Sequence, residues 1–273
     1  MSSDDGIDLD ALAEAYNAGL EAERAGRREA AVAAYRAALA IDPRDPGGVA
    51  IRLAVLGAGE VPAAAPPAYV ATLFDQTAER FEDILVGGLG YGVPGRLPGL
   101  LDRAGARRAA RLLDLGCGTG LVAEHLADRA DHLTGCDLSE EMVARAWDKT
   151  LYDALYVAEA VAFLESGEEA PFDLIVAADV LPYLGDLDAL LAGVAARLSP
   201  GGLFAASTES LPQESVERRG WALGPRHRYA HAPDYVARRL AAHGMAAIET
   251  APITVREEDG APVPGHLLLA RRG

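Results

Sequence analysis

The sequence predicts an α/β protein built on a mostly parallel sheet that helices cover on both faces, with an antiparallel pair of strands at its end. Three observations support this fold class. Short apolar runs alternate with helical patterns from residue 110 onward, and a glycine-rich turn follows the first of these runs. The last two predicted strands are joined directly by a short turn, which permits only antiparallel pairing. A smaller helical unit is predicted in front of the sheet.

The composition sets bounds on the class of function. The chain has 273 residues, of which 50% are hydrophobic, and this share allows a sizeable core. Its formal net charge of −16 argues against binding along a long nucleic-acid backbone. No apolar run approaches the roughly 20 residues that span a bilayer, and the amino terminus lacks the features of a signal peptide. We therefore expect a cytoplasmic protein that binds neither membranes nor bulk nucleic acid.

Residues 1–57 are predicted to form a helical region. Residues 8–43 resemble one tetratricopeptide repeat, because small and aromatic residues recur at its spacing: Gly19, Ala31, Tyr35, Ala38 and Pro43. Residues 45–56 are predicted to form a further helix. About three repeats are needed to bury a continuous core, so we expect this unit to pack on the rest of the chain, on a second copy or on a protein partner. A packing role and an interaction role both stay open.

Residues 58–67 are rich in alanine and proline and are predicted to form a linker. Residues 68–273 are predicted to form one domain that opens with the segment 68–92, here called the lid. This segment consists of a helix over 68–86 and a glycine-rich end. Its aromatic side chains either cover a bound ligand or belong to the core, and the candidates are Phe74, Phe81 and Tyr91.

The rest of the domain alternates strands and helices. Strands are predicted at 111–115, 132–136, 153–157, 172–178 and 202–208, and helices near 119–129, 139–149, 159–166 and 186–198. The tail differs, with a helix at 232–243 and strands at 245–255 and 265–271 around the turn Asp259-Gly260.

The main chemical signal is the stretch Arg111-Leu-Leu-Asp-Leu-Gly-Cys-Gly-Thr-Gly-Leu121, followed by Asp137 at the end of the second predicted strand. Its three alternate glycines allow a sharp turn and a close approach of the backbone to a ligand. The next helix presents free N–H groups to an anionic group, and Asp137 is placed to accept hydrogen bonds from a ribose. Cys117 and Cys136 lie within these motifs and are predicted to be small buried residues, neither disulfide-bonded nor metal ligands.

These motifs resemble those of the class I S-adenosylmethionine-dependent methyltransferases, which implies a Rossmann-like, doubly wound, seven-stranded sheet and S-adenosyl-L-methionine as the cofactor. The whole layout resembles a bacterial group of predicted methyltransferases that carry a tetratricopeptide repeat. The matching residues are 12–43, 69–92, 111–138, 172–183 and the loop Arg228-Tyr-Ala-His231.

The resemblance assigns the cofactor site. The loop residues that would surround the methionine and ribose end are Gly116, Cys117, Gly118 and Gly120. Asp114 would lie near the ammonium group, Asp137 would bind the ribose hydroxyls and Leu138 would pack on the adenine. Glu159 and Ala160 would contact the adenine edge, although relatives more often carry aspartate in place of Glu159. Phe74 and Tyr91 would cover the cofactor.

The acceptor side is predicted from the fourth strand and a basic loop. Asp179 closes an apolar strand at the edge where ligands bind in such sheets, so it either faces the transferred methyl group or caps the next turn. Tyr183 lies at the same mouth. The loop residues Arg218, Arg219, Arg226, His227, Arg228, Tyr229 and His231 are hypothesised to receive an anionic acceptor. His227 or His231 would then act as a base, and a solvated loop is the alternative.

Three functions follow in order of preference. The first is methyl transfer to an oxygen or nitrogen of a small molecule. The second is a protein methyltransferase, or an interaction protein that only binds cofactor, recruited through the helical repeat. The third is a nicotinamide-dependent oxidoreductase, because Gly118-Thr-Gly120-Leu-Val-Ala123 fits a dinucleotide pattern. Asp114 and the predicted terminal hairpin disfavour this last function.

Overall fold

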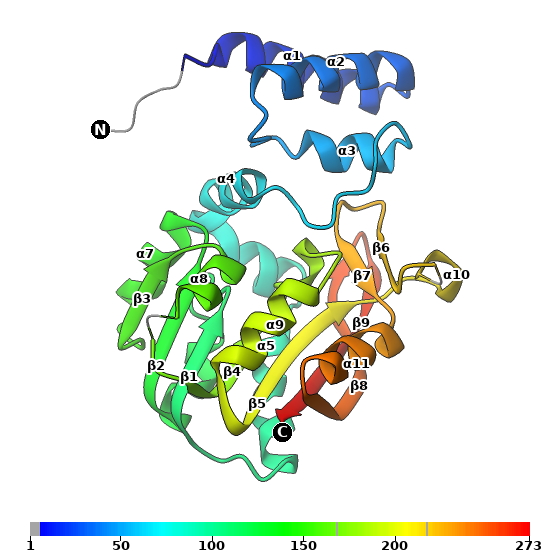
Figure 1. Cartoon of the computed structure of the whole chain (residues 1–273). Helices are drawn as coiled ribbons and strands as arrows, with labels where there is room; N and C mark the ends of the chain where they lie inside the picture. The colour runs from blue at the N-terminus through cyan, green and yellow to red at the C-terminus, as the bar shows by residue number, and fades with distance from the viewer. Residues whose placement is uncertain (1–5, 168, 217) are drawn as a thin grey trace.

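The computed structural model describes residues 6–167, 169–216 and 218–273, which are arranged around a nine-stranded sheet (Figure 1). Five of its strands run parallel in the spatial order β3-β2-β1-β4-β5. They are β1 (Ala109–Leu115), β2 (Ala130–Asp137), β3 (Ala154–Val157), β4 (Phe172–Ala177) and β5 (Leu198–Glu209). All five lie where the periodicity of the sequence predicts strands.

The sheet is closed on one side by the predicted antiparallel hairpin. Strand β8 (Met245–Glu258) pairs with β9 (Ala261–Arg272), and β9 pairs antiparallel with β5. The mostly parallel sheet and its terminal hairpin are therefore confirmed, and the seven expected strands are part of a sheet of nine. A second small hairpin, β6 (Trp221–Leu223) and β7 (Tyr229–His231), joins the carboxyl end of β5. The sequence analysis did not predict it, because three-residue strands carry too little periodicity.

Helices cover both faces of the sheet, as alternate residues of β4 show. Leu174 and Val176 pack in the cluster that contains α5 (Val93–Arg103) and α6 (Ala123–Leu126). Ile175 and Ala177 pack in the opposite cluster. The helices of that cluster are α8 (Ala160–Ser166), α9 (Asp188–Arg197) and α11 (Pro233–Ala242). Helix α7 (Glu140–Asp148) lies against β2 and β3.

Helix α5 is the main element that the sequence analysis missed. Its sequence contains Gly95, Pro98 and Gly99, all of which disfavour a helix interior. Burial of Leu97, Leu100 and Leu101 overrides this local preference. Conversely, the helix predicted at 119–129 is reduced to α6 and one 3-10 turn, because the loop before it is not helical. The short helix α10 (Gln213–Val216) was also not predicted.

The predicted helical hairpin is present at the amino-terminal end as α1 (Leu9–Arg24) and α2 (Arg28–Ile41). The two helices approach closely at Gly19, where an added Cβ would overlap the ring of Tyr35. The arrangement agrees with the helical part of the prediction, and its identity as a tetratricopeptide repeat stays a prediction.

Helix α3 (Val49–Val55) connects this hairpin to the rest of the chain (Figure 1). Its residues Val49 and Leu53 complete the core of the hairpin. Its residue Ile51, which is 1% exposed, packs instead in the main core together with residues of the sheet. The helical region and the sheet therefore share an interior.

The lid was predicted to contain one continuous helix over 68–86, but the structure divides it into three segments. It consists of α4 (Pro67–Thr77), a 3-10 turn (Ala78–Arg80) and a π-helical segment (Asp83–Gly88). The Thr77 hydroxyl donates back to the carbonyl oxygen of Leu73 at 2.9 Å, a contact that often bends helices. Across the described residues, no helix combines the length and the apolar character needed to cross a membrane.

Candidate active site

A cavity of about 810 Å³ lies at the carboxyl ends of the parallel strands. This volume is within the range of small-molecule sites. Its walls come from the loops after β1, β2, β3 and β4, from the lid and from the segment before α4. Of the predicted site residues, the cavity is lined by Phe74, Tyr91, Gly116, Cys117, Gly118, Asp137, Leu138, Glu159, Ala160 and Asp179.

The loop after β1 is shaped by glycines with left-handed backbone angles. Gly116 has φ +72°, and a Cβ at this position would overlap the side chain of Val180. Gly118 has φ +53°, and an added Cβ would have only the ring of Phe81 within 4 Å. The first glycine is thus required by packing, whereas the second leaves its face of the loop open to the cavity.

Asp137 connects this loop to the end of β2. One of its carboxylate oxygens accepts the Gly118 N–H at 2.8 Å, and the other accepts the Ser139 N–H at 2.9 Å. Each oxygen can accept a further hydrogen bond. Ser139, and not Asp137, caps α7, because its hydroxyl accepts the Met142 N–H at 3.1 Å. Asp137 therefore lines the cavity with acceptor capacity to spare.

The ends of β2 and β3 supply the next part of the wall. Leu138 and Ala160 line the cavity. Glu159 also lines it, and its carboxylate accepts the Ala162 N–H at 2.8 Å as the N-cap of α8. Glu159 thus has a structural role as a helix cap together with a position at the cavity.

Asp114 and Gly120 lie outside the cavity wall. Asp114 is fully buried behind the glycine loop, where one oxygen accepts the Tyr152 hydroxyl at 2.6 Å. Its other oxygen has no donor among the residues that the structure describes. Burial raises the pKa of Asp114 to about 7, so a cation bound nearby would favour its ionised form. The expected place of Asp114 near a ligand ammonium group stays a prediction, with the glycine loop between its carboxylate and the cavity.

Two polar contacts hold the lid against the loops. Glu82 accepts hydrogen bonds from the Thr119 hydroxyl and from Lys149 Nζ, each at 2.6 Å. Asp75 accepts the Ser139 hydroxyl at 2.5 Å. These acids were not singled out by the sequence analysis, because their partners lie far away in the chain.

The aromatic residues of the lid face the cavity, as predicted. The rings of Phe74 and Phe81 pack edge-on at 6.0 Å, and the rings of Phe74 and Tyr183 at 5.4 Å. Tyr91, at the end of the lid region, is 7% exposed and also lines the cavity. The lid therefore supplies both core contacts and a cover for the cavity.

Asp179 stands at the cavity just after β4. Its backbone is left-handed at φ +62°, and its N–H donates to the Ser207 hydroxyl at 2.8 Å. One carboxylate oxygen accepts Arg256 Nη1 at 2.8 Å, while Oδ1 is buried with no donor among the described residues. Burial raises the pKa of Asp179, and the Arg256 charge opposes this shift. Oδ1 therefore keeps acceptor capacity that the described residues do not use.

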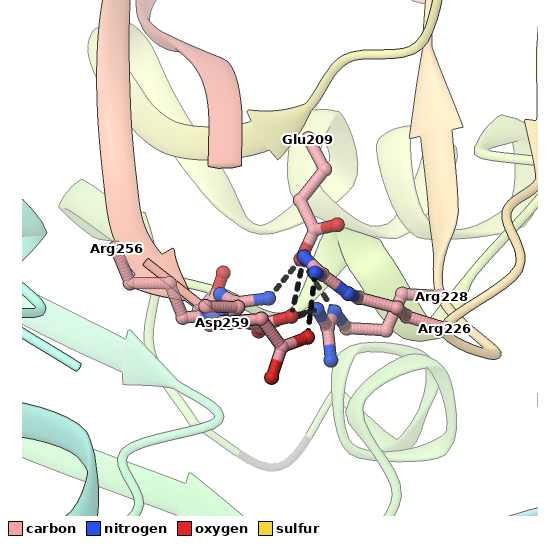
Figure 2. Close-up of polar contacts among 7 residues, drawn as sticks. Glu209, Arg226, Arg228, Arg256 and Asp259 are labelled. Atoms are coloured by element: carbon pink, nitrogen blue, oxygen red, sulfur yellow. Dashed lines mark hydrogen bonds and ion pairs between the residues drawn. The ribbon is translucent and has the colours of Figure 1, made fainter. Parts of the chain in front are cut away.

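Arg256 on β8 organises the acids around Asp179, and Figure 2 shows this cluster. The guanidinium group is 3% exposed and also binds Glu209 and, at 2.6 Å, Glu258. Arg228 binds the same two acids, each at 2.6 Å. Arg256, Arg228 and Glu258 line the cavity. No local pattern marks Arg256 in the sequence, because two of its three acidic partners, Asp179 and Glu209, lie far away in the chain.

This cluster corrects the hypothesis of an anion-binding loop. Arg226 pairs with Glu258 and Asp259 at 2.9 Å each, and Arg228 pairs with Glu209 and Glu258. The cations are matched by acids that other segments bring to the loop. Of the remaining basic residues, Arg219 lies over the Trp221 ring at 5.4 Å, and neither Arg218 nor Arg219 lines the cavity. The one arginine of this loop that lines the cavity within the described residues, Arg228, is thus already paired with two acids.

The two histidines proposed as bases also lie outside the cavity wall. His231 is 1% exposed, and its Nε2 lies 2.8 Å and 3.2 Å from the carbonyl oxygens of Leu184 and Gly185. Nε2 must carry a proton to make these bonds. His227 is half-buried, and burial followed by the charge of Arg52 in α3 lowers its pKa. Neither position suits a general base, so this prediction was wrong in its placement.

The buried His231 predicts a pH dependence of stability. Burial lowers its pKa from 6.5 to about 4 in the folded state, so the unfolded chain binds more protons between these values. Stability should therefore fall as the pH drops from 6.5 to 4, by about 3 kcal/mol from this group. Urea unfolding of wild type and His231→Gln at pH 7 and pH 4.5 measures this loss. Equal losses in both proteins would contradict it.

Comparisons with known proteins agree with this layout. The model of a family described as a methyltransferase domain matches residues 90–248. The ubiquinone biosynthesis O-methyltransferase of Xylella fastidiosa (strain 9a5c) is 36% identical over 102 residues, which is 36% of this chain and 42% of the relative. This chain thus spans less than half the length of that curated relative.

Solved structures show the same fold at low identity. A magnesium protoporphyrin IX methyltransferase from Synechocystis PCC 6803, solved with bound SAH, has a TM-score of 0.50 and 18% identity over 82% of this chain and 93% of that chain. An S-adenosylmethionine-dependent methyltransferase from Clostridium acetobutylicum has a TM-score of 0.54 and 15% identity, covering 74% of this chain and 99% of that chain.

Proposed function

Because the chain belongs to the methyltransferase-domain family, we propose that it transfers a methyl group from S-adenosylmethionine to an oxygen or nitrogen atom of a small molecule. The observation that carries this proposal is that Asp179, whose Oδ1 has no donor among the described residues, lines the same cavity as Asp137. Strands β2 and β4 flank β1, so the two acids are separated by two strand spacings, about 10 Å. One end of the cavity can hold a nucleoside while the other holds the acceptor.

The residues toward β3 fit the cofactor. Asp137 would bind the ribose hydroxyls, and the open backbone at Gly118 would approach the cofactor without obstruction. Leu138 and Ala160 would pack on the adenine, beside the Glu159 carboxylate. The cofactor's positive charge would stabilise the ionised form of Asp114, whose unpaired oxygen lies behind the loop. When bound, S-adenosylmethionine supplies a methyl group on a sulfonium, which a nucleophile can attack.

The residues toward β4 fit the acceptor. Asp179 Oδ1 would accept the proton of an acceptor hydroxyl or amine, as a general base does. Arg256 holds the other oxygen and so fixes the direction of the free one. Phe74 and Tyr183 would exclude water and orient the acceptor, which favours reaction through positioning. A hydroxyl oxygen is favoured as the methylated atom, because it gains most from a base and because the Xylella relative is named an O-methyltransferase.

Ligand-dependent thermal shifts test the cofactor part of this proposal. S-adenosylmethionine and S-adenosylhomocysteine should raise the melting temperature in proportion to the logarithm of their concentration. Stabilisation by NAD alone would overturn the proposal. Incubation with methyl-labelled S-adenosylmethionine and an organic-solvent extract of cells carrying the gene tests the acceptor part. Label in a small molecule is expected, and label confined to protein would favour a protein acceptor instead.

Asp137→Ala should weaken the binding of S-adenosylhomocysteine. The loss of charged hydrogen bonds to the ribose costs about 1.5–3 kcal/mol of binding free energy, which raises the dissociation constant roughly 10- to 150-fold. Isothermal titration calorimetry measures it. Asp186→Asn, at another acid of the cavity wall, is the control and should bind like wild type. Wild-type affinity in Asp137→Ala would remove the ribose assignment.

A further inference from the structure

The segment between α3 and α4 is fixed to the loop after β4. We call residues 62–67, Pro-Ala-Ala-Ala-Pro-Pro, the strap. The carbonyl oxygen of Ala63 accepts the N–H groups of Gly185 and Asp186 at 2.8 Å each. The Ala65 N–H donates to the Tyr183 carbonyl oxygen, also at 2.8 Å. Residues expected to form a linker are thus held like the edge of a small sheet.

Further contacts hold both ends of the strap. The Tyr229 hydroxyl donates to the Pro62 carbonyl oxygen at 2.9 Å. Before the strap, Ile51 of α3 is buried in the main core, and after it Tyr69 of α4 packs over Gly48. The amino-terminal helical unit therefore anchors the strap.

The strap forms part of the cavity wall. Its residues 63–67 line the cavity together with Tyr183, whose carbonyl oxygen accepts the Ala65 N–H, and Leu184, the bridge partner of Ala64. Every side chain of the strap is an alanine methyl or a proline ring. This part of the wall is apolar, and its small side chains leave room that larger ones would fill.

The wall lies on the acceptor side. Tyr183 belongs to the loop that follows Asp179, and the nearby Asp179 carboxylate contributes to the raised pKa of Tyr183 after burial. The residues suited to the cofactor follow β1, β2 and β3 instead. The strap also lies outside residues 90–248, which the family model matches.

We infer that the strap is the specificity wall of the acceptor site, that it receives the apolar body of the acceptor, and that the amino-terminal helical unit exists to hold it there. The inference rests on the proposed methyl transfer. It assigns the helical unit a role inside the enzyme in place of partner recruitment. An acceptor with an apolar face would pack on the strap while its hydroxyl or amine reaches Asp179.

Ala64 offers the test, because it is half-buried, lines the cavity and pairs with Leu184 through its backbone. Ala64→Leu should reduce the space for the acceptor, and Ala64→Val, a smaller change, serves if the leucine variant does not fold. Glu60→Leu is the control, since Glu60 lies in the same connection, is exposed and does not line the cavity. The probe is the organic-solvent extract with methyl-labelled S-adenosylmethionine, used at graded extract concentrations.

The expected result is an apparent KM for the extract that rises at least tenfold in Ala64→Leu, with S-adenosylhomocysteine affinity within twofold of wild type. The labelled product should partition into the organic phase, and the control should behave like wild type. An unchanged KM, an equal loss of S-adenosylhomocysteine affinity or a purely aqueous product would overturn the inference alone. No labelled product from the wild type would overturn the proposed function, and this inference with it.

Discussion

Replacing Arg256 with methionine should lower the free energy of unfolding by about 3–5 kcal/mol at pH 7, because it leaves buried carboxylates without their counter-charge. The guanidinium group is 3% exposed and binds Asp179, Glu209 and Glu258. Of the cations around them, Arg228 would remain to pair with two of these acids. Urea unfolding followed by circular dichroism measures the loss.

The matched control is Arg226→Met. Arg226 is 41% exposed and pairs with Glu258 and Asp259, so its removal should cost less than about 1 kcal/mol. The difference between the two variants should also depend on pH. Burial opposes ionisation of Glu258, but its bonds to Arg256 and Arg228 lower its folded-state pKa. Its contribution is therefore present above the unfolded pKa and is lost as the pH falls. Equal losses in both variants would refute the role given to Arg256.

Asp179→Asn should reduce methyl transfer by about 10²- to 10⁴-fold, the usual contribution of a general base. Asparagine keeps the size of the side chain and tolerates the left-handed backbone, so the fold should be retained. Binding of S-adenosylhomocysteine should change by less than twofold. Label transfer to the extract and calorimetry measure the two quantities.

The control for this substitution is Asp186→Asn, because Asp186 lines the same cavity but is exposed. It should retain most of the methyl-transfer activity. If Asp179→Asn keeps activity within threefold of wild type, Asp179 is not the proton acceptor. In that event the free Oδ1 would only orient the bound molecule.

The sheet could be predicted because its signals are local. Each parallel strand is an apolar run, and the loop after β1 can be recognised from its alternate glycines. Ser139 caps α7 through the Met142 N–H, a contact that lies within four consecutive residues. Asp137 was placed at the ligand side by the same short motif, and its position at the cavity agrees with that placement.

The rest depends on contacts between distant residues. Arg256 binds Asp179 across 77 positions, so no window of sequence links the two. The basic loop was misinterpreted for the same reason, since Glu209 and Glu258 reach it from β5 and β8. His231 looked available for proton transfer, but the carbonyl groups that occupy it belong to residues 184 and 185. The secondary-structure element of a charged residue was thus easier to predict than the residues with which its side chain pairs.

Ile51 has a practical consequence for cutting the chain into parts. It belongs to the helical region by sequence, yet it fills the same interior as Leu113 and Ile175 of the sheet. A truncation at residue 57 would remove the Ile51 side chain and expose the apolar core residues around it to water. The two regions should therefore melt together in one cooperative transition, and expression boundaries drawn between them would yield an aggregating fragment.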